Sequence, residues 1–143
     1  MNKANFYTQE VSWAEAKATL SSIRQQVFVK EQNVPLDMEL DEHDVNSNHL
    51  LAIDDHGTPV GTARLLPDGH IGRMAVLAEF RGNGIGSQLL TDIIELAKAK
   101  GIRTVTLHAQ TQAVEFYIKH HFHIVSEEFM EAGIPHVEMQ RQL

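Results

Sequence analysis

The segment Arg81-Gly82-Asn83-Gly84-Ile85-Gly86-Ser87 combines the residue types of an anion-binding site. It follows a short apolar stretch and precedes a helical pattern, so we expect it to form the turn that opens a helix. The first N–H groups of a helix have no partner within it and lie at the positive end of its dipole. Glycines let a phosphate come close to these donors, and Arg81 adds a fixed positive charge. The segment therefore predicts an anion site.

Three nucleotide-binding patterns can be compared with this segment. A Walker loop needs Gly-Lys-Ser/Thr after its glycines, and no lysine occurs between Arg81 and Lys98. A dinucleotide fingerprint counted from Gly82 has Ser87 in place of its third glycine. The pattern Arg-x-x-Gly-x-Gly fits in full. The alternative without function is that the glycines only make a tight turn before a helix.

The elements that would position this loop can be predicted from hydrophobic periodicity, caps and turn residues. Ser12 and Glu15 have the spacing of a capping box, from which a helix is expected to run to about Phe28. The polar, acidic stretch 31–44 is interrupted by Pro35 and indicates a solvated loop or a broken short helix. Further helices are expected at 86–100 and 114–120, and strands at 6–11, 49–53, 60–66, 71–77, 102–107, 124–129 and 137–139.

The order of these elements indicates an α/β fold in which helices pack on a mixed sheet. Three successive strands separated by turns are expected to be antiparallel. The strand from Ile102 should run parallel to the one that ends at Leu77, because a helix crosses between them. No linker or repeat is evident, so we expect one domain over residues 1–143.

Composition restricts the function. The 143 residues, 43% of them hydrophobic and 22% charged, are typical of a globular domain. The formal net charge of −7 argues against nucleic acid as a partner. The chain has no cysteine, which excludes disulfides and a cysteine nucleophile. No signal-like or membrane-spanning apolar run occurs, so a cytoplasmic location and no membrane partner are expected.

The chain resembles the GCN5-related N-acetyltransferase (GNAT) superfamily over nearly its whole length. The resemblance rests on the Arg81-x-x-Gly84-x-Gly86 loop after the strand Arg73-Met74-Ala75-Val76, and on Ala113-x-x-Phe116-Tyr117-x-Lys119-x-x-Phe122. Segments around Glu31, at His108-Ala109-Gln110 and at Gly133-Ile134-Pro135-His136 resemble a small bacterial single-domain subgroup. One departure is His121-Phe122, where the family commonly has Gly-Phe.

The resemblance implies a mostly antiparallel sheet with one splayed parallel pair of strands, helices on both faces, and acetyl-CoA as co-substrate in the resulting cleft. The loop would hold the pyrophosphate, and the preceding strand would hydrogen-bond the pantetheine arm. Tyr117 occupies the position of the family's general acid, which protonates the departing thiolate. The residues expected to contact acetyl-CoA are Met74, Ala75, Val76, Arg81, Gly82, Asn83, Gly84, Ile85, Gly86, Ser87, Phe116 and Lys119.

Direct transfer requires a neutral amine, so a general base is sought among the acidic residues and histidines. Glu31 and His136 are the favoured catalytic candidates because they lie in the subgroup-like segments, while a water-mediated base or none at all stays open. The other candidates are Glu39, Asp41, Glu42 and His108. The nine histidines, including His120-His121-x-His123, do not have the spacing of a metal site, and no metal is expected.

The predicted function is acetyl transfer from acetyl-CoA to a primary amine of a small molecule, such as an amino sugar, polyamine or amino acid. One alternative is a protein or peptide N-acetyltransferase. Another is a non-catalytic domain that senses acetyl-CoA. Dimers are frequent in the superfamily, so a homodimer is expected by analogy.

Overall fold

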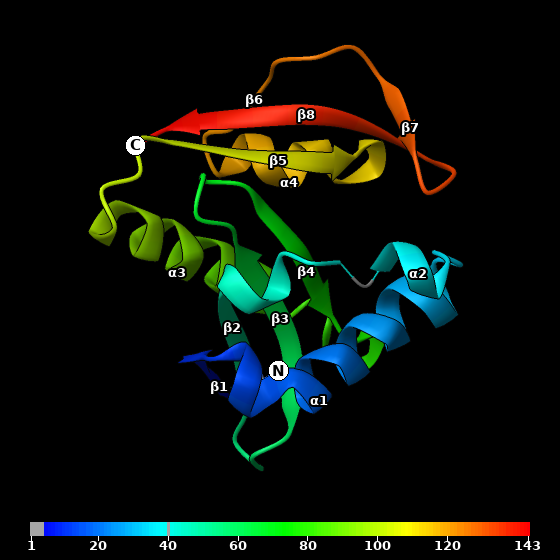
Figure 1. Ribbon diagram of the computed structural model, residues 1–143, viewed down its shortest axis with the longest axis vertical. Helices are drawn as coiled ribbons and strands as arrows, with labels where there is room; N and C mark the ends of the chain where they lie inside the picture. Colours follow the sequence, from blue (N-terminus) through cyan, green and yellow to red (C-terminus); the bar gives the residue numbers. More distant parts are fainter. Residues whose placement is uncertain (1–4, 40) are drawn as a thin grey trace.

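The strands form two sheets that stand one above the other in Figure 1. The computed structural model describes residues 5–39 and 41–143, so the first four residues and Leu40 in the acidic stretch lie outside the described residues. The first sheet is antiparallel throughout and has the order β1 (Phe6–Val11), β2 (Asn48–Asp54), β3 (Pro59–Leu65), β4 (Ile71–Val76). In the second, β8 (Ile134–Gln142) pairs antiparallel with β5 (Thr104–Gln110), β6 (His123–Ile124) and β7 (Phe129–Glu131).

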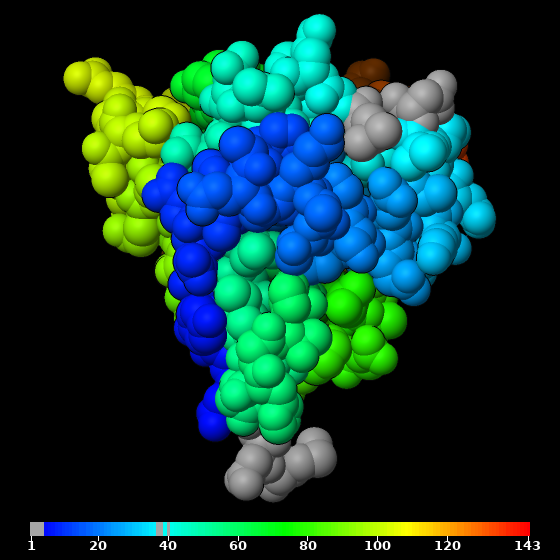
Figure 2. Space-filling view, turned by 60° about the horizontal axis from the view of Figure 1, so that its bottom comes forward, coloured from blue at the N-terminus to red at the C-terminus, as the bar shows by residue number. Residues whose placement is uncertain are grey.

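Helices cover both faces of the first sheet, as predicted. Leu50 and Ala52 of β2 belong to the cluster that packs against α3 (Ile85–Ala99), whereas Leu51 packs with α1 (Trp13–Arg24). This division follows from the alternation of side chains along a strand. Figure 2 views the side on which α1 and the chain after it (blue to cyan) lie over the first sheet (green).

The first helix begins as predicted and ends differently. The Ser12 hydroxyl accepts a hydrogen bond of 3.2 Å from the Glu15 amide, which confirms the cap. The α-helical pattern stops at Arg24 instead of Phe28 and continues as a π-helix, η1 (Gln25–Glu31). Such wide turns are frequent at functional sites because they change the direction of the side chains. Here Val27 and Phe28 of the π-helix face the cavity described below.

The two sheets touch at one point and then diverge. The Thr106 amide of β5 donates a 3.1 Å hydrogen bond to the Gly69 carbonyl, and His70 and Thr106 form a parallel bridge. A Cβ at position 69 would lie 2.5 Å from the Thr104 carbonyl oxygen, so the close approach requires glycine. Beyond this bridge β4 and β5 share no ladder among the described residues. This confirms the predicted parallel orientation and the splayed pair.

The remaining elements are short. α2 (Leu36–Glu39) and a 3-10 turn, η2 (Asp44–Asn46), lie in the acidic stretch, and two further 3-10 turns, η3 (Ala78–Phe80) and η4 (Thr111–Ala113), precede α3 and α4 (Val114–Lys119). The alternative of a broken short helix is confirmed by α2, whereas the interpretation of Glu39 to Asp44 as a solvated loop was wrong, since Glu39 and Asp44 are buried. Within the described part of the chain, no helix is long and apolar enough to cross a membrane.

Candidate active site

The divergence of β4 and β5 opens a cavity of about 860 Å³. Its walls come from β4 and the start of α3 on one side and from β5, α4 and the β7–β8 hairpin on the other. Most of the residues singled out by the sequence line it: Met74, Ala75, Val76, Arg81, Gly82, Gly84, Ile85, Gly86, Ser87, Phe116, Tyr117 and His136. The cavity lining does not include Glu31, Asn83 or Lys119.

The glycine loop has the geometry of an open anion cradle. Gly84 caps α3 with φ 81°, a left-handed conformation that favours glycine. The first backbone hydrogen bond of α3 that reaches back into the loop runs from Gln88 N to Gly84 O, so the amides of the first turn remain for an outside acceptor. A Cβ built at Gly82 or Gly84 meets no atom within 4 Å. The space above the donors therefore fits a phosphate group.

Arg81 lies beside this cradle but already holds an ion pair. Its guanidinium donates to both oxygens of Glu31, at 2.6 and 2.8 Å, and its Nε donates to the Val76 carbonyl at 3.0 Å. The hydrogen bonds from Arg81 lower the pKa of the Glu31 carboxyl, and those to Glu31 raise the pKa of Arg81. Since Glu31 is half-exposed on the rim and a weaker base than usual, its position favours holding Arg81 over taking a proton.

A bulge interrupts β4 just before the residues that face the cavity. The register moves from Thr62 opposite Ala75 to Arg64 opposite Gly72, so Arg73 and Met74 together oppose Ala63. Arg73 has φ 49°, which is unfavourable for a side chain of its size, and the Thr62 hydroxyl donates to its carbonyl at 2.9 Å. A bulge leaves backbone groups out of the ladder and redirects the strand. The strand at Met74 is thereby turned toward the cavity.

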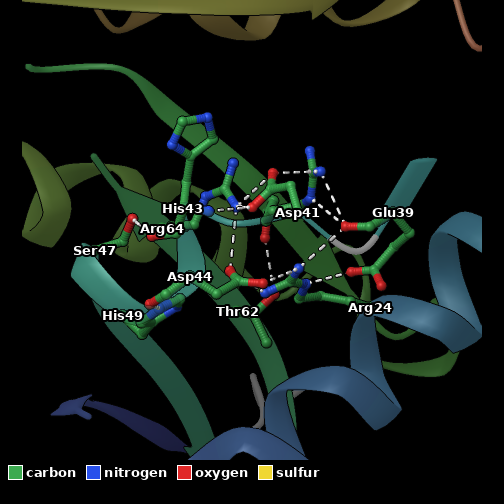
Figure 3. A network of polar contacts seen from close by, with 10 residues as sticks. Arg24, Glu39, Asp41, His43, Asp44, Ser47, His49, Thr62 and Arg64 are labelled. Atoms are coloured by element: carbon green, nitrogen blue, oxygen red, sulfur yellow. Dashed lines mark hydrogen bonds and ion pairs between the residues drawn. The ribbon is translucent and has the colours of Figure 1, made fainter. Parts of the chain in front are cut away.

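A buried network of ion pairs, which we call the arginine network, supports this bulge (Figure 3). It joins three arginines on α1, β3 and β4 to three carboxylates of the acidic stretch. Arg24 donates two hydrogen bonds to Asp44, of 2.9 and 3.1 Å, and one to Glu39. Arg64 donates to both Asp41 and Asp44. Arg73 donates to Asp41 at 2.9 Å and to the Glu39 carbonyl. Positive and negative charges balance, as buried ions require.

The network lowers the pKa of two of its carboxylates, Asp41 and Asp44. Burial acts to raise the pKa of Asp44, but the hydrogen bonds and charges of Arg24 and Arg64 outweigh it, so the pKa is lowered. The same holds for Asp41, whose pKa Arg64 and Arg73 lower against the effect of burial. A carboxylate with a lowered pKa is a poor general base. Asp41 is therefore better explained as a structural ion pair, and Glu39 is held in the same network by Arg24.

Tyr117 extends from α4 into the aromatic lining of the cavity. Its ring packs edge-on against Phe116 and Phe122, with centroids 5.1 and 6.0 Å away. Burial raises the pKa of the phenol to about 12, so the hydroxyl keeps its proton at neutral pH. Among the described residues the hydroxyl has no hydrogen-bond partner. The cavity is therefore lined by a protonated phenol without a hydrogen-bond partner among the described residues.

Opposite β4, one face of three neighbouring strands presents titratable side chains to the cavity. Register places Phe129 opposite His136, Gln110 opposite His136, and His108 opposite Glu138. Cross-strand partners share a face, and so do residues two apart along a strand. Glu131 on β7 consequently lies near two imidazoles, with its carboxylate 2.9 Å from His108 Nδ1 and 3.7 Å from His136 Nε2.

The His136 ring is held in one tautomer. Its Nδ1 lies 2.7 Å from the Ile134 carbonyl, which can only accept, so Nδ1 carries the proton. In the neutral ring Nε2 is then a free base, and it faces the cavity side where Glu131 lies. The ring is buried and stacks on Phe129 with centroids 6.0 Å apart.

Sequence reasoning missed the bulge at Arg73 and the part played by Glu131. Nothing in the local sequence marks the bulge, because the residue with positive φ is an arginine. For Glu131 the sequence does contain a signal, because Gly133 indicates a tight turn just after it. Ala132 and Gly133, with φ of 52° and 75°, form a two-residue hairpin turn that fixes Glu131 beside β8. Over the described residues, no group of three or more histidines and carboxylates is arranged to hold a metal ion.

Comparison with known proteins agrees with this architecture. Residues 7–143 match the family described as acetyltransferase (GNAT) domain. YjcF of Bacillus subtilis, named an uncharacterized N-acetyltransferase, is 42% identical over 123 residues, which are 83% of this chain and 87% of the relative.

Two crystal structures superpose over almost their full length. An acyl-CoA N-acyltransferase from Pseudomonas aeruginosa is 31% identical with a TM-score of 0.82, over 96% of this chain and 99% of that chain. ElaA of Escherichia coli is 29% identical with a TM-score of 0.85, over 95% of this chain and 99% of that chain. The match of nearly the whole sequence, together with the splayed strands and the glycine loop, shows that this chain belongs to the GNAT family of acetyltransferases and is an acyltransferase enzyme.

Proposed function

We propose that this chain, acting as a single acetyltransferase domain, moves an acetyl group directly from acetyl-CoA to a primary amine of a small molecule. The observation that carries the proposal is the cradle at the start of α3, where open amides meet the space above Gly82 and Gly84. This space leads into one cavity that also contains Tyr117 and His136. When bound, acetyl-CoA would supply the acetyl thioester.

The cradle would hold the pyrophosphate through the amides from Gly84 to Ser87. The bulged strand would present main-chain donors of Met74 to Val76 along the pantetheine arm and at the thioester carbonyl. In other enzymes one preorganised donor of this kind contributes about 3 kcal/mol to the transition state. Phe116 would pack beside the arm from the opposite wall.

Two side chains would move protons. His136 Nε2, free to accept, would take the proton that the acceptor ammonium must lose before it can attack. Tyr117 would give its hydroxyl proton to the departing thiolate sulfur, and the second proton that the nitrogen loses as the amide forms would restore the phenol. Because the chain has no cysteine, transfer without a thioester to the enzyme is the simplest route.

The acceptor end of the cavity supports a small substrate. Phe28 and Val34 line it on the side of the first sheet, and Ile134 and Ala132 line it on the side of the hairpin. A cavity of about 860 Å³ favours a molecule that enters it whole over a folded polypeptide.

Replacing Gly84 by aspartate tests the proposal. The side chain would place a negative charge in the cradle, and we expect acetyl-CoA affinity measured by calorimetry to fall at least about 100-fold, because charge and space both oppose the pyrophosphate. Gly57→Asp is the matched control, since Gly57 has the same φ of 81° and equally open surroundings but lies in the β2–β3 turn. Unchanged affinity in Gly84→Asp would disprove the cradle's role.

A further inference from the structure

The charged residues that line the cavity fall into two groups. Among the described residues, each lining arginine has a carboxylate partner: Arg64 has Asp41 and Asp44, Arg73 has Asp41, and Arg81 has Glu31. The lining carboxylate Glu39 is likewise paired, with Arg24.

Glu131 is different. Its two oxygens face only imidazoles, His108 at 2.9 Å and His136 at 3.7 Å, and neither arginine nor lysine pairs with it in the described part of the chain. The charges around it do not compensate. His108 also faces Glu138 at 3.7 Å, and His70, which packs edge-on against His108, is paired with Asp68. Among the described residues, no arginine or lysine therefore offsets the carboxylate of Glu131 at this end of the cavity.

The hairpin holds this charge in place. Glu131 is the last residue of β7, and its strand partner Ile134 follows a turn of only two residues. Phe129 lies against both imidazoles, with ring centroids 5.1 Å from His108 and 6.0 Å from His136. A carboxylate flanked by rings and fixed on a tight hairpin is suited to bind a cationic group.

We propose that Glu131 binds the ammonium group of the acceptor and so selects amines that carry no carboxylate next to the nitrogen. The inference rests on the proposed function and specifies its substrate class. An amine seated at Glu131 has His136 Nε2 within reach of its proton. An α-amino acid would bring its own carboxylate toward Glu131 and Glu138, while the arginines that could offset it are already paired.

The test compares acceptors that differ in one carboxylate. Thiol release from acetyl-CoA is measured with phenethylamine against phenylalanine, 3-methylbutylamine against leucine, and tyramine against tyrosine. We expect kcat/KM to be at least about tenfold higher for the amine of each pair. Glu131→Gln, which keeps the size and an acceptor for His108, should raise KM for the amines about tenfold and shrink the difference between the members of each pair.

Glu128→Gln is the matched control, an exposed carboxylate in the segment just before β7, and it should leave both constants within about twofold of the parent. Acetyl-CoA affinity, measured separately by calorimetry, should be the same in all three proteins. Equal use of amino acids and amines, an unchanged KM in Glu131→Gln, or no transfer to any of the six acceptors would each overturn the inference. Absence of acetyl-CoA binding by the parent would instead overturn the proposed function itself.

Discussion

The two walls of the cavity use their residues in different ways. On the β4 wall the charged side chains are paired with one another, and what faces the cavity is mainly main chain and glycine. On the wall made by β5, α4 and the β7–β8 hairpin, the side chains Tyr117, His136 and Glu131 remain available to a ligand. In the proposed function, the first wall binds acetyl-CoA and the second supplies the groups that exchange protons.

This difference has a physical origin. In the proposed function, main-chain donors of β4 bind the pantetheine arm along a strand with an unusual path, and holding Arg73 in its unfavourable conformation costs on the order of 1–3 kcal/mol. The arginine network supplies the contacts that hold Arg73 in place. On the other wall, regular strand pairing and a hairpin position the side chains, so charged groups there are not needed for support.

Breaking the arginine network should produce the largest change in stability. Asp44→Asn removes the charge between Arg24 and Arg64 while keeping the shape of the side chain. Leaving two buried arginines without their shared carboxylate should lower the free energy of unfolding by about 3–5 kcal/mol. Urea denaturation measures this free energy, provided that the midpoint of the transition and its dependence on urea concentration are analysed together.

Asp55→Asn serves as the control, because Asp55 is half-exposed in the β2–β3 turn and, among the described residues, forms only a long ion pair of 3.6 Å with His56. It should change the free energy of unfolding by less than about 0.5 kcal/mol. A loss below 1 kcal/mol in Asp44→Asn, about the value of a surface pair, would show that the network is not what supports the β4 wall.

A substitution on the wall made by β5, α4 and the β7–β8 hairpin should change the rate of acetyl transfer and leave the stability of the fold nearly unchanged. Tyr117→Phe removes a hydroxyl that has no hydrogen-bond partner among the described residues, so unfolding should change little. Loss of the proton donor should lower kcat by about 10²- to 10⁴-fold. Steady-state thiol release gives the rate, and calorimetry should find acetyl-CoA affinity within about twofold of the parent.

Tyr7→Phe is a natural control, because Tyr7 is the chain's other tyrosine and is exposed on β1. It should leave kcat unchanged. If Tyr117→Phe kept full turnover, the assignment of the proton donor would be wrong, and the contrast between the two walls would lose its main support.

The sequence predicts those parts of the architecture that depend on residues close together in the chain. Ser12 with Glu15, the glycines before α3 and the turn residues between strands each determine a short stretch of backbone, and these elements formed as expected. The parallel relation of β4 and β5 followed from one crossing helix. The conformation of the loop before α3 is predictable because its glycines lie within five consecutive residues, 82–86.

The arginine network could not be found in this way. Arg24 and Arg64 lie on either side of the acidic stretch and at a distance from it in the chain, so the stretch looked like a solvated loop. Which charges meet is decided by the packing of α1 against β3 and β4, and no local pattern records it. The bulge at Arg73 could not be predicted for the same reason. No glycine marks it in the sequence, and contacts with residues distant in the chain stabilise it.

The smallest effect is expected at the rim of the β4 wall, where Arg81 and Glu31 are paired and half-exposed. Glu31→Gln should change the free energy of unfolding by less than about 1 kcal/mol, as is usual for exposed pairs. It also removes a negative charge beside the cradle. We therefore expect acetyl-CoA to bind up to about threefold more tightly at low salt, and this gain to vanish at 1 M salt, where charges are screened within about 3 Å.

Glu79→Gln separates the effect of pairing from that of charge alone, because Glu79 is exposed near the same loop and has no ion-pair partner among the described residues. An equal gain in both variants would mean that the pyrophosphate responds to overall charge, with no particular role for Arg81. Weaker acetyl-CoA binding in Glu31→Gln alone would contradict the expectation that Glu31 opposes the pyrophosphate by its charge. Glu31 would then be the residue that holds the guanidinium in its binding position, and the β4 wall would depend on one side-chain contact after all.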